Sequence, residues 1–255
     1  HAEDINLVGE GCMNEGVVSS RLGLPGIPDA SEEVLVDRDI RLARLTGGRY
    51  HVAHLSTAGA LESVARAKAD GIKVTCEVAP HHFALTDEAV KGYDANAKMA
   101  PPLRNEVDRN QLLEGLAKGL VDAIATDHAP HDEDSKRVEF CKASYGVVGL
   151  ETMLPVSLEL VRDGVISLSD CLALMTCKPA GLLGIDRGTL ALGRPADLVL
   201  FDLEADWVVD AARFQGKARN TCFQGRRVKG RVKQTLVGGL SVYQDDGNAP
   251  DFMGR

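Results

Sequence analysis

The spacing of apolar and polar positions along the first part of the chain predicts a series of helices. In residues 31–46, Val36, Ile40 and Ala43 recur on one helical face. Ser31 can cap the start of this helix, and acidic residues fill its first turn. The same periodicity predicts further helices over residues 59–70, 105–119 and 150–164.

Short β-rich or apolar runs lie between these helices. Asn105 is expected to cap the helix over residues 105–119, and Pro155 is expected to kink or restart the helix over residues 150–164. The predicted strands cover residues 50–56, 72–79 and 121–127, with a brief extended run at residues 97–103.

Strands and helices thus alternate, and the strands are apolar rather than strictly alternating, which is typical of a parallel sheet covered by helices. The Gly-x-Gly-x-x-Gly sequence of a dinucleotide-binding fold does not occur. His54 and Asp127 lie at predicted strand ends, where a (β/α) barrel carries its reactive residues. After about residue 186 the chain becomes β-rich and glycine-punctuated, so we expect part of a barrel over residues 1–185 and a small β domain segment over residues 186–255.

Composition excludes several classes of protein. The 255 residues are 44% hydrophobic and 26% charged, which is typical of a globular chain. The net charge of −8 argues against a nucleic-acid partner, and no apolar run reaches the roughly 20 residues of a membrane span. The six cysteines are scattered without a Cys-x-x-Cys pair, which argues against a zinc ribbon and suits a reducing cytoplasm.

All seven histidines lie within the first 131 residues, which indicates one chemical region in that part of the chain. His51 and His54 are three residues apart on a strand, so their side chains should point to opposite faces. We expect His54 to face the barrel interior because it is nearer the strand end. The alternative is a core histidine bonded to a backbone carbonyl.

The run "DAIATDHAPHDED", residues 122–134, ends an apolar strand in an acid and two imidazoles. Pro130 favours an extended backbone before it, so Asp127 and His131 should face one way and His128 the other. Imidazole and carboxylate are ligands suited to zinc, and a carboxylate beside an activated water can carry its proton. This pattern predicts metal-assisted hydrolysis of an amide-like bond. The alternatives are a cap for Asp127 and a solvated loop for His131.

Three further stretches could contribute to a site. The Pro-His-His run that contains His81 and His82 could hold a metal ligand or form a packed corner. Arg104 could bind an anionic substrate or lie on the surface. The glycines of residues 9–16 suggest a loop that closely approaches another group.

Motifs spread over nearly the whole chain resemble class I bacterial dihydroorotases of the amidohydrolase superfamily. "PADLVLFD" alone marks the superfamily, whereas "TDHAPH" together with "GLET" favours dihydroorotase over dihydropyrimidinase or allantoinase. The motifs occur in the order "HAED", "MNEG", "LGLPGIP", "HVAHLST", "EVAPHH", "KMAPPLR", "ATDHAPH", "GVVGLET" and "GRPADLVLFD".

The resemblance implies a partial (β/α)8 TIM-type barrel of about strands 4–8 with a small C-terminal β region and a centre for two zinc ions. His1, His54 and Asp127 resemble metal ligands, and Asp127 also resembles the general acid and base. His131 resembles a residue that holds the substrate carboxylate, and the backbone of Tyr145 and Gly146 lies where the family contacts the substrate ring. His51, His81, His82 and His128 match no family ligand.

The chain departs from the family pattern at two places. Ala100 replaces an asparagine that commonly contacts substrate. The His-x-His of the first barrel strand and the bridging ligand are not found, so we expect the chain to be the C-terminal part of a longer enzyme and to be inactive and poorly folded by itself.

The function implied by the resemblance is zinc-dependent cyclisation of N-carbamoyl-L-aspartate to L-dihydroorotate, reversibly, in pyrimidine biosynthesis. One alternative is another cyclic amidohydrolase acting on hydantoins or allantoin. The other is an inactive scaffold for a carbamoyltransferase, although the retained His1, His54, Asp127 and His131 argue against it. The implied partners are a small-molecule substrate and either further copies of the chain or a carbamoyltransferase.

Overall fold

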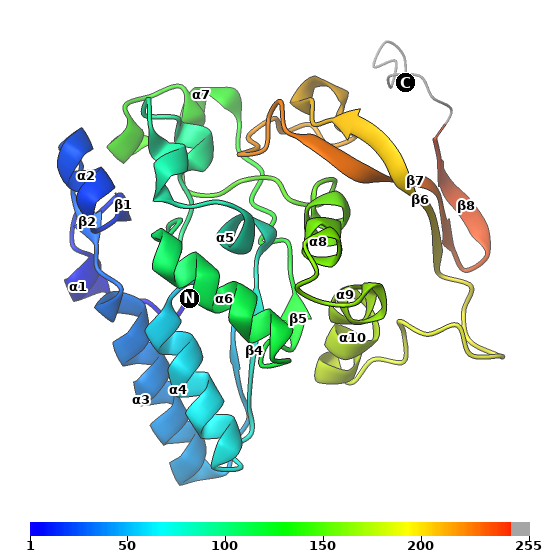
Figure 1. The fold of residues 1–255 in the computed structure, drawn as a ribbon, viewed down its shortest axis with the longest axis horizontal. Coiled ribbons are helices and arrows are strands. Elements are labelled where there is room, and N and C mark those ends of the chain that lie inside the picture. The colour runs from blue at the N-terminus through cyan, green and yellow to red at the C-terminus, as the bar shows by residue number, and fades with distance from the viewer. Residues whose placement is uncertain (246–255) are drawn as a thin grey trace.

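The computed structural model describes residues 1–245 and shows an α/β unit followed by an antiparallel sheet (Figure 1). The helices are α1 (Ile5–Val8), α2 (Val17–Leu22), α3 (Ala30–Thr46), α4 (Ala58–Ala69), α5 (Pro80–Ala84), α6 (Glu106–Ala117), α7 (Glu133–Lys136), α8 (Met153–Arg162), α9 (Leu168–Met175) and α10 (Cys177–Leu183). The strands are β1 (Met13–Asn14), β2 (Gly26–Ile27), β3 (Tyr50–Val52), β4 (Val74–Val78), β5 (Ala123–Ile124), β6 (Leu198–Val208), β7 (Arg227–Val237) and β8 (Leu240–Gln244). No helix in this part of the chain has the length and apolar character needed to cross a membrane.

A parallel sheet of order β3-β4-β5 forms the centre of the α/β unit, as the sequence predicts. Val52, Cys76 and Val78 point into the buried core from one face of this sheet. His51 lies on the opposite face, where its ring bonds to Thr75. All three strands are shorter than predicted. The chain turns away sharply soon after β3 and β5, at His54 and Asp127. The sheet therefore brings several polar loops to its carboxyl edge.

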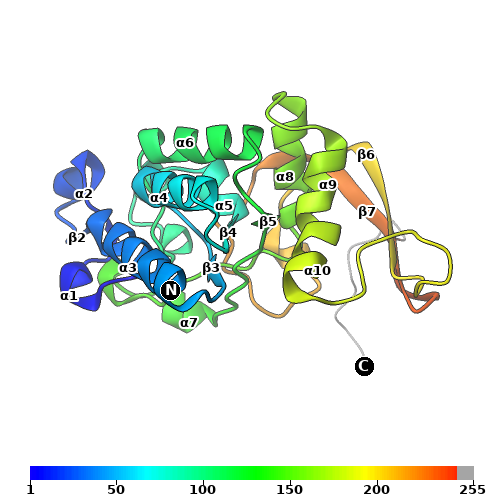
Figure 2. The same cartoon turned by 90° about the horizontal axis from the view of Figure 1, so that it is seen from below.

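Helices α3, α4 and α6 lie side by side along the parallel strands (Figures 1 and 2). Leu61 and Val64 of α4 and Leu112 of α6 are buried against the sheet. The two helices approach closely at Gly115, because a Cβ there would lie 2.6 Å from Cδ2 of Leu61. This layer fixes the sheet and leaves its carboxyl edge open for a site.

The helix predictions are confirmed with corrections at their ends. Asn105 caps α6 as expected, since its side chain accepts hydrogen bonds from two backbone N–H groups of the first turn. Ser31 does not cap α3, because its hydroxyl donates to the Pro28 carbonyl instead. Pro155 does not kink α8, because it lies in the first turn of the helix. Backbone N–H groups in that turn have no hydrogen-bond partner within the helix, so the N–H that proline lacks is not needed there. The extended run predicted at residues 97–103 is a loop after a short 3-10 turn at Ala95–Ala97.

The β-rich region forms an antiparallel sheet of order β6-β7-β8. Helix α8 joins this sheet to the α/β unit: the Arg226 guanidinium pairs with Glu159, at 2.5 Å between Nη2 and Oε2. Phe223 and Val228 belong to the same buried core as the parallel strands, so the two regions share one hydrophobic core. Helices α9 and α10, which the sequence analysis did not predict, lie between them (Figure 2).

The cysteines differ from the expectation of isolated thiols. Cys12 and Cys141 form a disulfide across a sequence separation of 129 residues, with their Cα atoms 5.3 Å apart. The other cysteines, Cys76, Cys171, Cys177 and Cys222, are free thiols. Sequence spacing could not reveal this pair, because the fold alone brings its two loops together.

Candidate active site

A cavity of about 610 Å³ opens at the carboxyl edge of the parallel sheet. Its walls come from the N-terminal segment, the glycine loop before β1, the loop after β5 and the segment around residue 145. The lining includes His1, Glu3, Gly9, Gly11, Ala100, Asp127, Ala129, Tyr145 and Gly146. The site residues predicted from the sequence thus come from separate segments and lie in or beside one cavity.

His1, His54 and Asp127 lie together at this cavity. The imidazole rings of His1 and His54 have their centroids 4.4 Å apart, with an interplanar angle of 44°. His54 acts on Asp127 electrostatically and favours its charged form. His54 is buried, whereas His1 is exposed. The expected juxtaposition of two imidazoles with one carboxylate is therefore present.

The backbone is strained at two of these three residues. His54 has φ of 36° and Asp127 has φ of 48°, both in the left-handed region that residues with a Cβ seldom occupy. Tyr93 is the other non-glycine residue with positive φ among residues 1–245. Such conformations cost about 1–3 kcal/mol each and cluster at functional sites. The chain thus bends at both strand ends, where Asp127 lines the cavity and His54 lies against the ring of His1.

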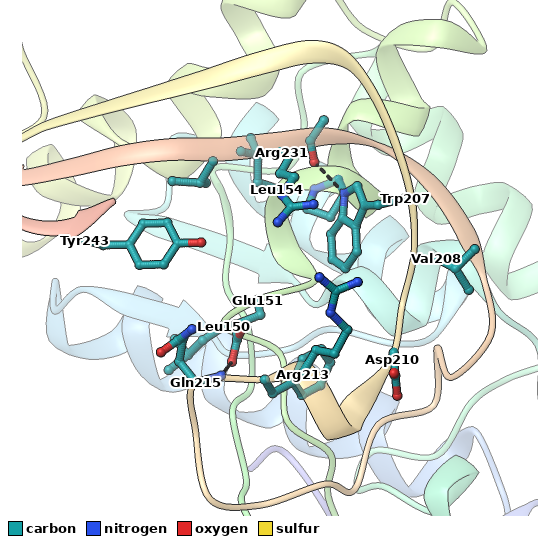
Figure 3. Close-up of a pocket in the computed structure, with 14 residues that line it drawn as sticks. Leu150, Glu151, Leu154, Trp207, Val208, Asp210, Arg213, Gln215, Arg231 and Tyr243 are labelled. Carbon is teal, nitrogen blue, oxygen red and sulfur yellow. Dashed lines mark hydrogen bonds between the residues drawn. The ribbon is translucent and has the colours of Figure 1, made fainter. Parts of the chain in front are cut away.

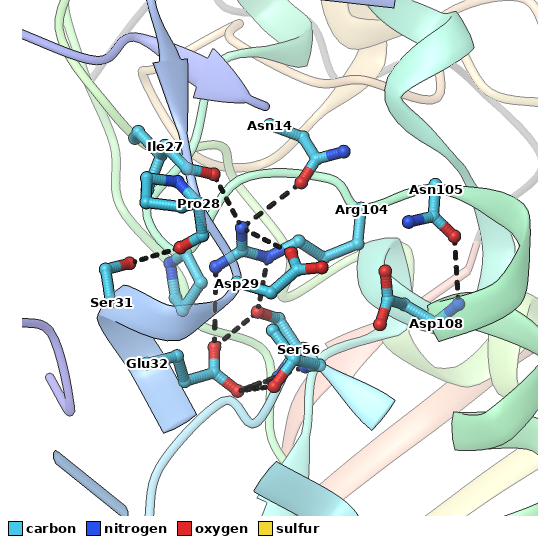
Figure 4. A network of polar contacts seen from close by, with 12 residues as sticks. Asn14, Ile27, Pro28, Asp29, Ser31, Glu32, Ser56, Arg104, Asn105 and Asp108 are labelled. Atoms are coloured by element: carbon cyan, nitrogen blue, oxygen red, sulfur yellow. Dashed lines mark hydrogen bonds and ion pairs between the residues drawn. The ribbon is translucent and has the colours of Figure 1, made fainter. Parts of the chain in front are cut away.

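A buried polar network holds the chain directly after His54 (Figure 4). The Glu32 carboxylate accepts from the backbone N–H groups of Ser56 and Thr57, at 2.9 and 3.0 Å. Arg104 donates to Asp29 at 3.0 Å and to Ser56 at 3.1 Å, and it is 4% exposed. Arg104 is thus neither a surface residue nor a substrate ligand. It neutralises buried acids and fastens the loop behind the site.

Burial raises the pKa of Asp127, while the neighbouring His54 acts in the opposite direction. His81 is 2% exposed, and its Nε2 atom lies 3.8 Å from the Asp127 carboxylate. Burial, reinforced by His54, lowers the pKa of His81 to about 3, so this imidazole is neutral at pH 7. The contact is accordingly a polar one between a carboxylate and a neutral ring.

The remaining histidines have structural partners. His82 is buried, and its Nε2 atom lies 2.9 Å from the Pro101 carbonyl. His128 accepts a hydrogen bond from the Gly149 N–H at 3.1 Å. His51 bonds to Thr75 and lies 3.2 Å from a Glu77 oxygen, on the sheet face opposite the one that packs against α4 and α6. The Pro-His-His run is thus a packed corner, although His81 also reaches the site.

His131 lies at the rim of the cavity. Its Nε2 atom is 2.7 Å from the Tyr145 carbonyl oxygen, so this nitrogen carries the proton. Asn220 holds the two segments together, because its side chain donates to the carbonyls of Ala129 at 2.9 Å and Gly146 at 3.1 Å. A Cβ at Gly146 would lie 2.4 Å from that of Ala129, so the close approach requires glycine.

The donor chemistry of the site fits a zinc ion, although residues 1–245 contain no group of three or more His, Cys, Asp or Glu placed closely enough to form a closed metal site. The Nδ1 atom of His54 is buried without a hydrogen-bond partner. Buried polar atoms are nearly always bonded, and a bound cation near this ring would satisfy its lone pair. Two imidazoles and a carboxylate are also ligands that zinc prefers.

A second cavity, of about 280 Å³, lies between α8 and the antiparallel sheet (Figure 3). Leu154 and Trp207 contribute apolar surface, and the Trp207 indole N–H donates to the Gly230 carbonyl at 3.0 Å. None of the strand-end histidines or Asp127 lines it. The candidate site residues therefore lie away from this second cavity.

Sequence reasoning missed several residues that shape the site. His81 matches no family ligand, and Asn220 lies 91 and 74 residues after the two residues, Ala129 and Gly146, whose carbonyls it joins. The spacing of "NTCF" around Asn220 carries no recognisable pattern. Only the fold, which places this segment against the loop after β5, reveals its contribution.

Comparison with known proteins agrees with this arrangement. The chain matches the amidohydrolase family over residues 37–242. It is 54% identical over 244 residues to a dihydroorotase of Geobacter sp. (strain M21), and 52% identical over 245 residues to a dihydroorotase of Anaplasma phagocytophilum. Each alignment covers 96% of this chain, but 57% and 55% of the relatives. The chain thus spans somewhat more than half the length of these relatives.

Solved structures show the same fold. The L-hydantoinase of Arthrobacter aurescens superposes with a TM-score of 0.82 at 33% identity, over 86% of this chain and 50% of that one. The dihydropyrimidinase of Brevibacillus agri superposes with a TM-score of 0.83 at 26% identity, over 96% of this chain and 56% of that one. The α/β fold is therefore of the amidohydrolase type, and the chain belongs to the amidohydrolase family.

Proposed function

We propose that the protein containing this chain is a dihydroorotase, which interconverts N-carbamoyl-L-aspartate and L-dihydroorotate in pyrimidine biosynthesis. The observation that carries the proposal is the combination of 54% identity to a dihydroorotase over 96% of the chain with the gathering of His1, His54 and Asp127 at one cavity. The first supplies the substrate class and the second supplies a site of suitable chemistry.

His1, His54 and Asp127 would hold zinc, with two ions expected for a complete site. When bound, zinc supplies Lewis acidity that polarises a carbonyl and lowers the pKa of a nearby water. His54 suits this role because its ring is buried and has a nitrogen without a partner. Its strained backbone directs the ring toward His1 rather than along the strand.

Asp127 would move the proton. In hydrolysis, a water oxygen attacks the ring amide carbon, Asp127 accepts the water proton, and the same proton passes to the ring nitrogen as the carbon–nitrogen bond breaks. In cyclisation, Asp127 accepts a proton from the attacking ureido nitrogen and delivers it to the departing oxygen. Burial raises the pKa of Asp127 and the neighbouring His54 opposes this shift.

His131, Tyr145 and Gly146 would bind the substrate. His131 uses Nε2 to donate to the Tyr145 carbonyl, and its Nδ1 would bind a substrate carboxylate when that nitrogen also carries a proton. The carbonyls of Tyr145 and Gly146 each accept one side-chain hydrogen bond and keep a second lone pair for a ring N–H. Ala100 lines the cavity but offers no side-chain hydrogen bond, so any contact made there by asparagine in relatives has to come from another group.

We further propose that the parallel sheet β3–β5 belongs to a (β/α)8 barrel, of which residues 1–185 form about strands 4–8, and that residues 186–255 form a small β domain segment, of which residues 246–255 lie outside the described part of the chain. Support comes from the position of the cavity at the carboxyl ends of parallel strands. The end of α10 at Leu183 and the start of β6 at Leu198 lie on either side of the proposed boundary.

A second candidate function is hydrolysis of hydantoin or dihydropyrimidine rings, favoured by the likeness to the Arthrobacter aurescens and Brevibacillus agri enzymes. The test uses the purified full-length protein loaded with zinc. Initial rates are measured on L-dihydroorotate, hydantoin, dihydrouracil and allantoin. We expect L-dihydroorotate to be hydrolysed fastest. Faster turnover of an uncharged ring would replace the dihydroorotase proposal with the second candidate.

Location and assembly are separate proposals. The free cysteines Cys76, Cys171, Cys177 and Cys222 support a cytoplasmic location, whereas the Cys12–Cys141 disulfide does not. Cell fractionation tests whether the protein is found in the cytoplasm. The proposed partners are further copies of the chain or a carbamoyltransferase, and light scattering of the full-length protein with and without the transferase tests both.

A further inference from the structure

Two lysines are buried next to the cavity without an acidic partner. Lys98 is 1% exposed and Lys136 is 7% exposed. Neither lysine takes part in an ion pair within residues 1–245, and among acids only Asp94 acts on Lys136 electrostatically, without a bond to it. A buried charge is costly unless it is paired or fully hydrogen-bonded. Their presence therefore needs an explanation beyond packing.

Both ammonium groups are bonded to backbone carbonyls of one segment. Lys98 Nζ donates to Cys141 at 2.8 Å and to Ala143 at 2.7 Å. Lys136 Nζ donates to Ser144 at 2.7 Å. The bonded segment thus ends directly before Tyr145 and Gly146, which line the cavity.

The two lysines are also joined to each other and to the lining residues. Lys136 Nζ donates to the carbonyl of Lys98 at 3.2 Å, and the same carbonyl accepts from the Gly146 N–H at 2.9 Å. The Lys98 ammonium lies 4.1 Å from the centroid of the Tyr145 ring, a cation–π distance. The backbone on both sides of the Tyr145–Gly146 peptide is therefore anchored to this lysine pair.

Desolvation disfavours the charged form of both lysines. Burial lowers the pKa of Lys98 and of Lys136 to about 8. Methionine would fill a similar volume without that penalty. Ammonium groups instead offer several N–H donors that can fix carbonyl groups in chosen directions.

We propose that Lys98 and Lys136 are positioning residues that set the place of the Tyr145–Gly146 backbone against the substrate ring. This inference rests on the proposed function, because it takes that backbone to be the ring-binding element. The lysines do not touch substrate. They act through the carbonyls of residues 141–144 and through the Tyr145 ring.

The test compares Lys98→Met and Lys136→Met with wild type in the full-length zinc enzyme. Loss of the anchors should raise KM for L-dihydroorotate by about tenfold to hundredfold, the range for a lost buried hydrogen bond. The effect on kcat should be smaller, and zinc per chain should not change, since neither lysine adjoins a proposed ligand. A variant that folds and keeps the wild-type KM overturns the proposal, as does an equal loss in kcat with unchanged KM.

Lys68→Met is the matched control. Lys68 of α4 also donates to a carbonyl, that of Leu120 at 2.6 Å. Unlike the other two lysines it pairs with a carboxylate, that of Asp122 at 2.6 Å, and this contact lies before the start of β5, away from the cavity. Its replacement should lower the melting temperature and leave KM unchanged. An equal rise in KM in this control would show a general effect of stability and overturn the positioning role.

Lys98→Gln and Lys136→Gln address failure of the methionine variants to fold, because glutamine can still donate to a carbonyl. If only the glutamine variants fold, a KM above that of wild type supports the proposal, because the shorter amide cannot make all the bonds of the ammonium group, and a wild-type KM overturns it. If neither replacement folds at either position, the lysines serve folding and the proposal is wrong. The wild-type measurement distinguishes failure of the proposed function from failure of this inference. If the wild-type protein does not turn over L-dihydroorotate, the proposed function is wrong, whatever the variants do.

Discussion

At the scale of single residues, Asp127 carries the proposed proton transfer. Asp127→Asn keeps the size of the side chain but removes its ability to accept a proton. We expect turnover of L-dihydroorotate by the full-length protein to fall by about 10²- to 10⁴-fold, the usual contribution of general acid–base catalysis. Absorbance of the ring gives the rate, and circular dichroism confirms the fold. Activity within threefold of wild type would remove Asp127 from the mechanism.

His54 and His51 provide an internal comparison for metal binding. His54 is buried beside His1, whereas His51 bonds to Thr75 on the exposed sheet face. His54→Ala should therefore lower the zinc content per chain of the full-length protein, measured by atomic emission, and His51→Ala should leave it unchanged. The opposite result would mean that the ligand lies on the strand itself rather than at its strained end.

At the scale of elements, a buried carboxyl joins α6 to the start of α4. Asp108 is 4% exposed and accepts from the Ala58 N–H at 2.9 Å. Its second oxygen has no hydrogen-bond partner among residues 1–245. Burial raises its pKa from 3.8 to about 6, although the bond from Ala58 opposes this shift.

This pKa determines the sign of a pH effect. Between pH 3.8 and about 6, the folded state holds a proton on Asp108 that the unfolded state has lost, so this group makes the free energy of unfolding fall as pH rises. Asp108→Asn should remove that contribution and flatten the pH dependence measured by urea unfolding. Glu114→Gln on the exposed face of α6 is the control and should retain the wild-type slope. A steeper slope in Asp108→Asn would contradict the assignment.

The sequence predicted elements better than their ends. Helical periodicity identified α3, α4, α6 and α8, because each buries one regular face. The strands were predicted too long, since the apolar run through Val52 and Leu55 continues beyond the point where His54 adopts positive φ. Residue type does not reveal that bend. Lys98 and Lys136 were missed for a related reason: their carbonyl partners are ordinary backbone, brought to them only by the fold.

At the scale of the whole molecule, the antiparallel sheet is attached to the α/β unit through a close contact at Gly230. This glycine has φ of 101°, and a Cβ there would lie 2.5 Å from Cδ1 of Leu158 in α8. Gly230→Ala should destabilise the protein by about 1–3 kcal/mol through backbone strain and overpacking. Thermal unfolding of the full-length protein measures the loss.

Gly216→Ala is the control for this change, because no atom lies within 4 Å of a Cβ built there. It should leave the melting temperature within about one degree of wild type, since open positions of this kind tolerate alanine. Equal stability of the two variants would show that the sheet moves on α8 to admit the methyl group.

The bonds to Glu32 have a consequence for the timescale on which the site opens. The Ser56 and Thr57 N–H groups are buried and donate to a carboxylate on α3, so their hydrogens can exchange with solvent only when α3 separates from this loop. We expect both amides to exchange with deuterium as slowly as those of the central strand β4. The exposed Gly48 amide, which bonds only to Thr46 at the other end of β3, should exchange far sooner. The segment after His54 would then be a loop by geometry and part of the slow-exchanging core by kinetics.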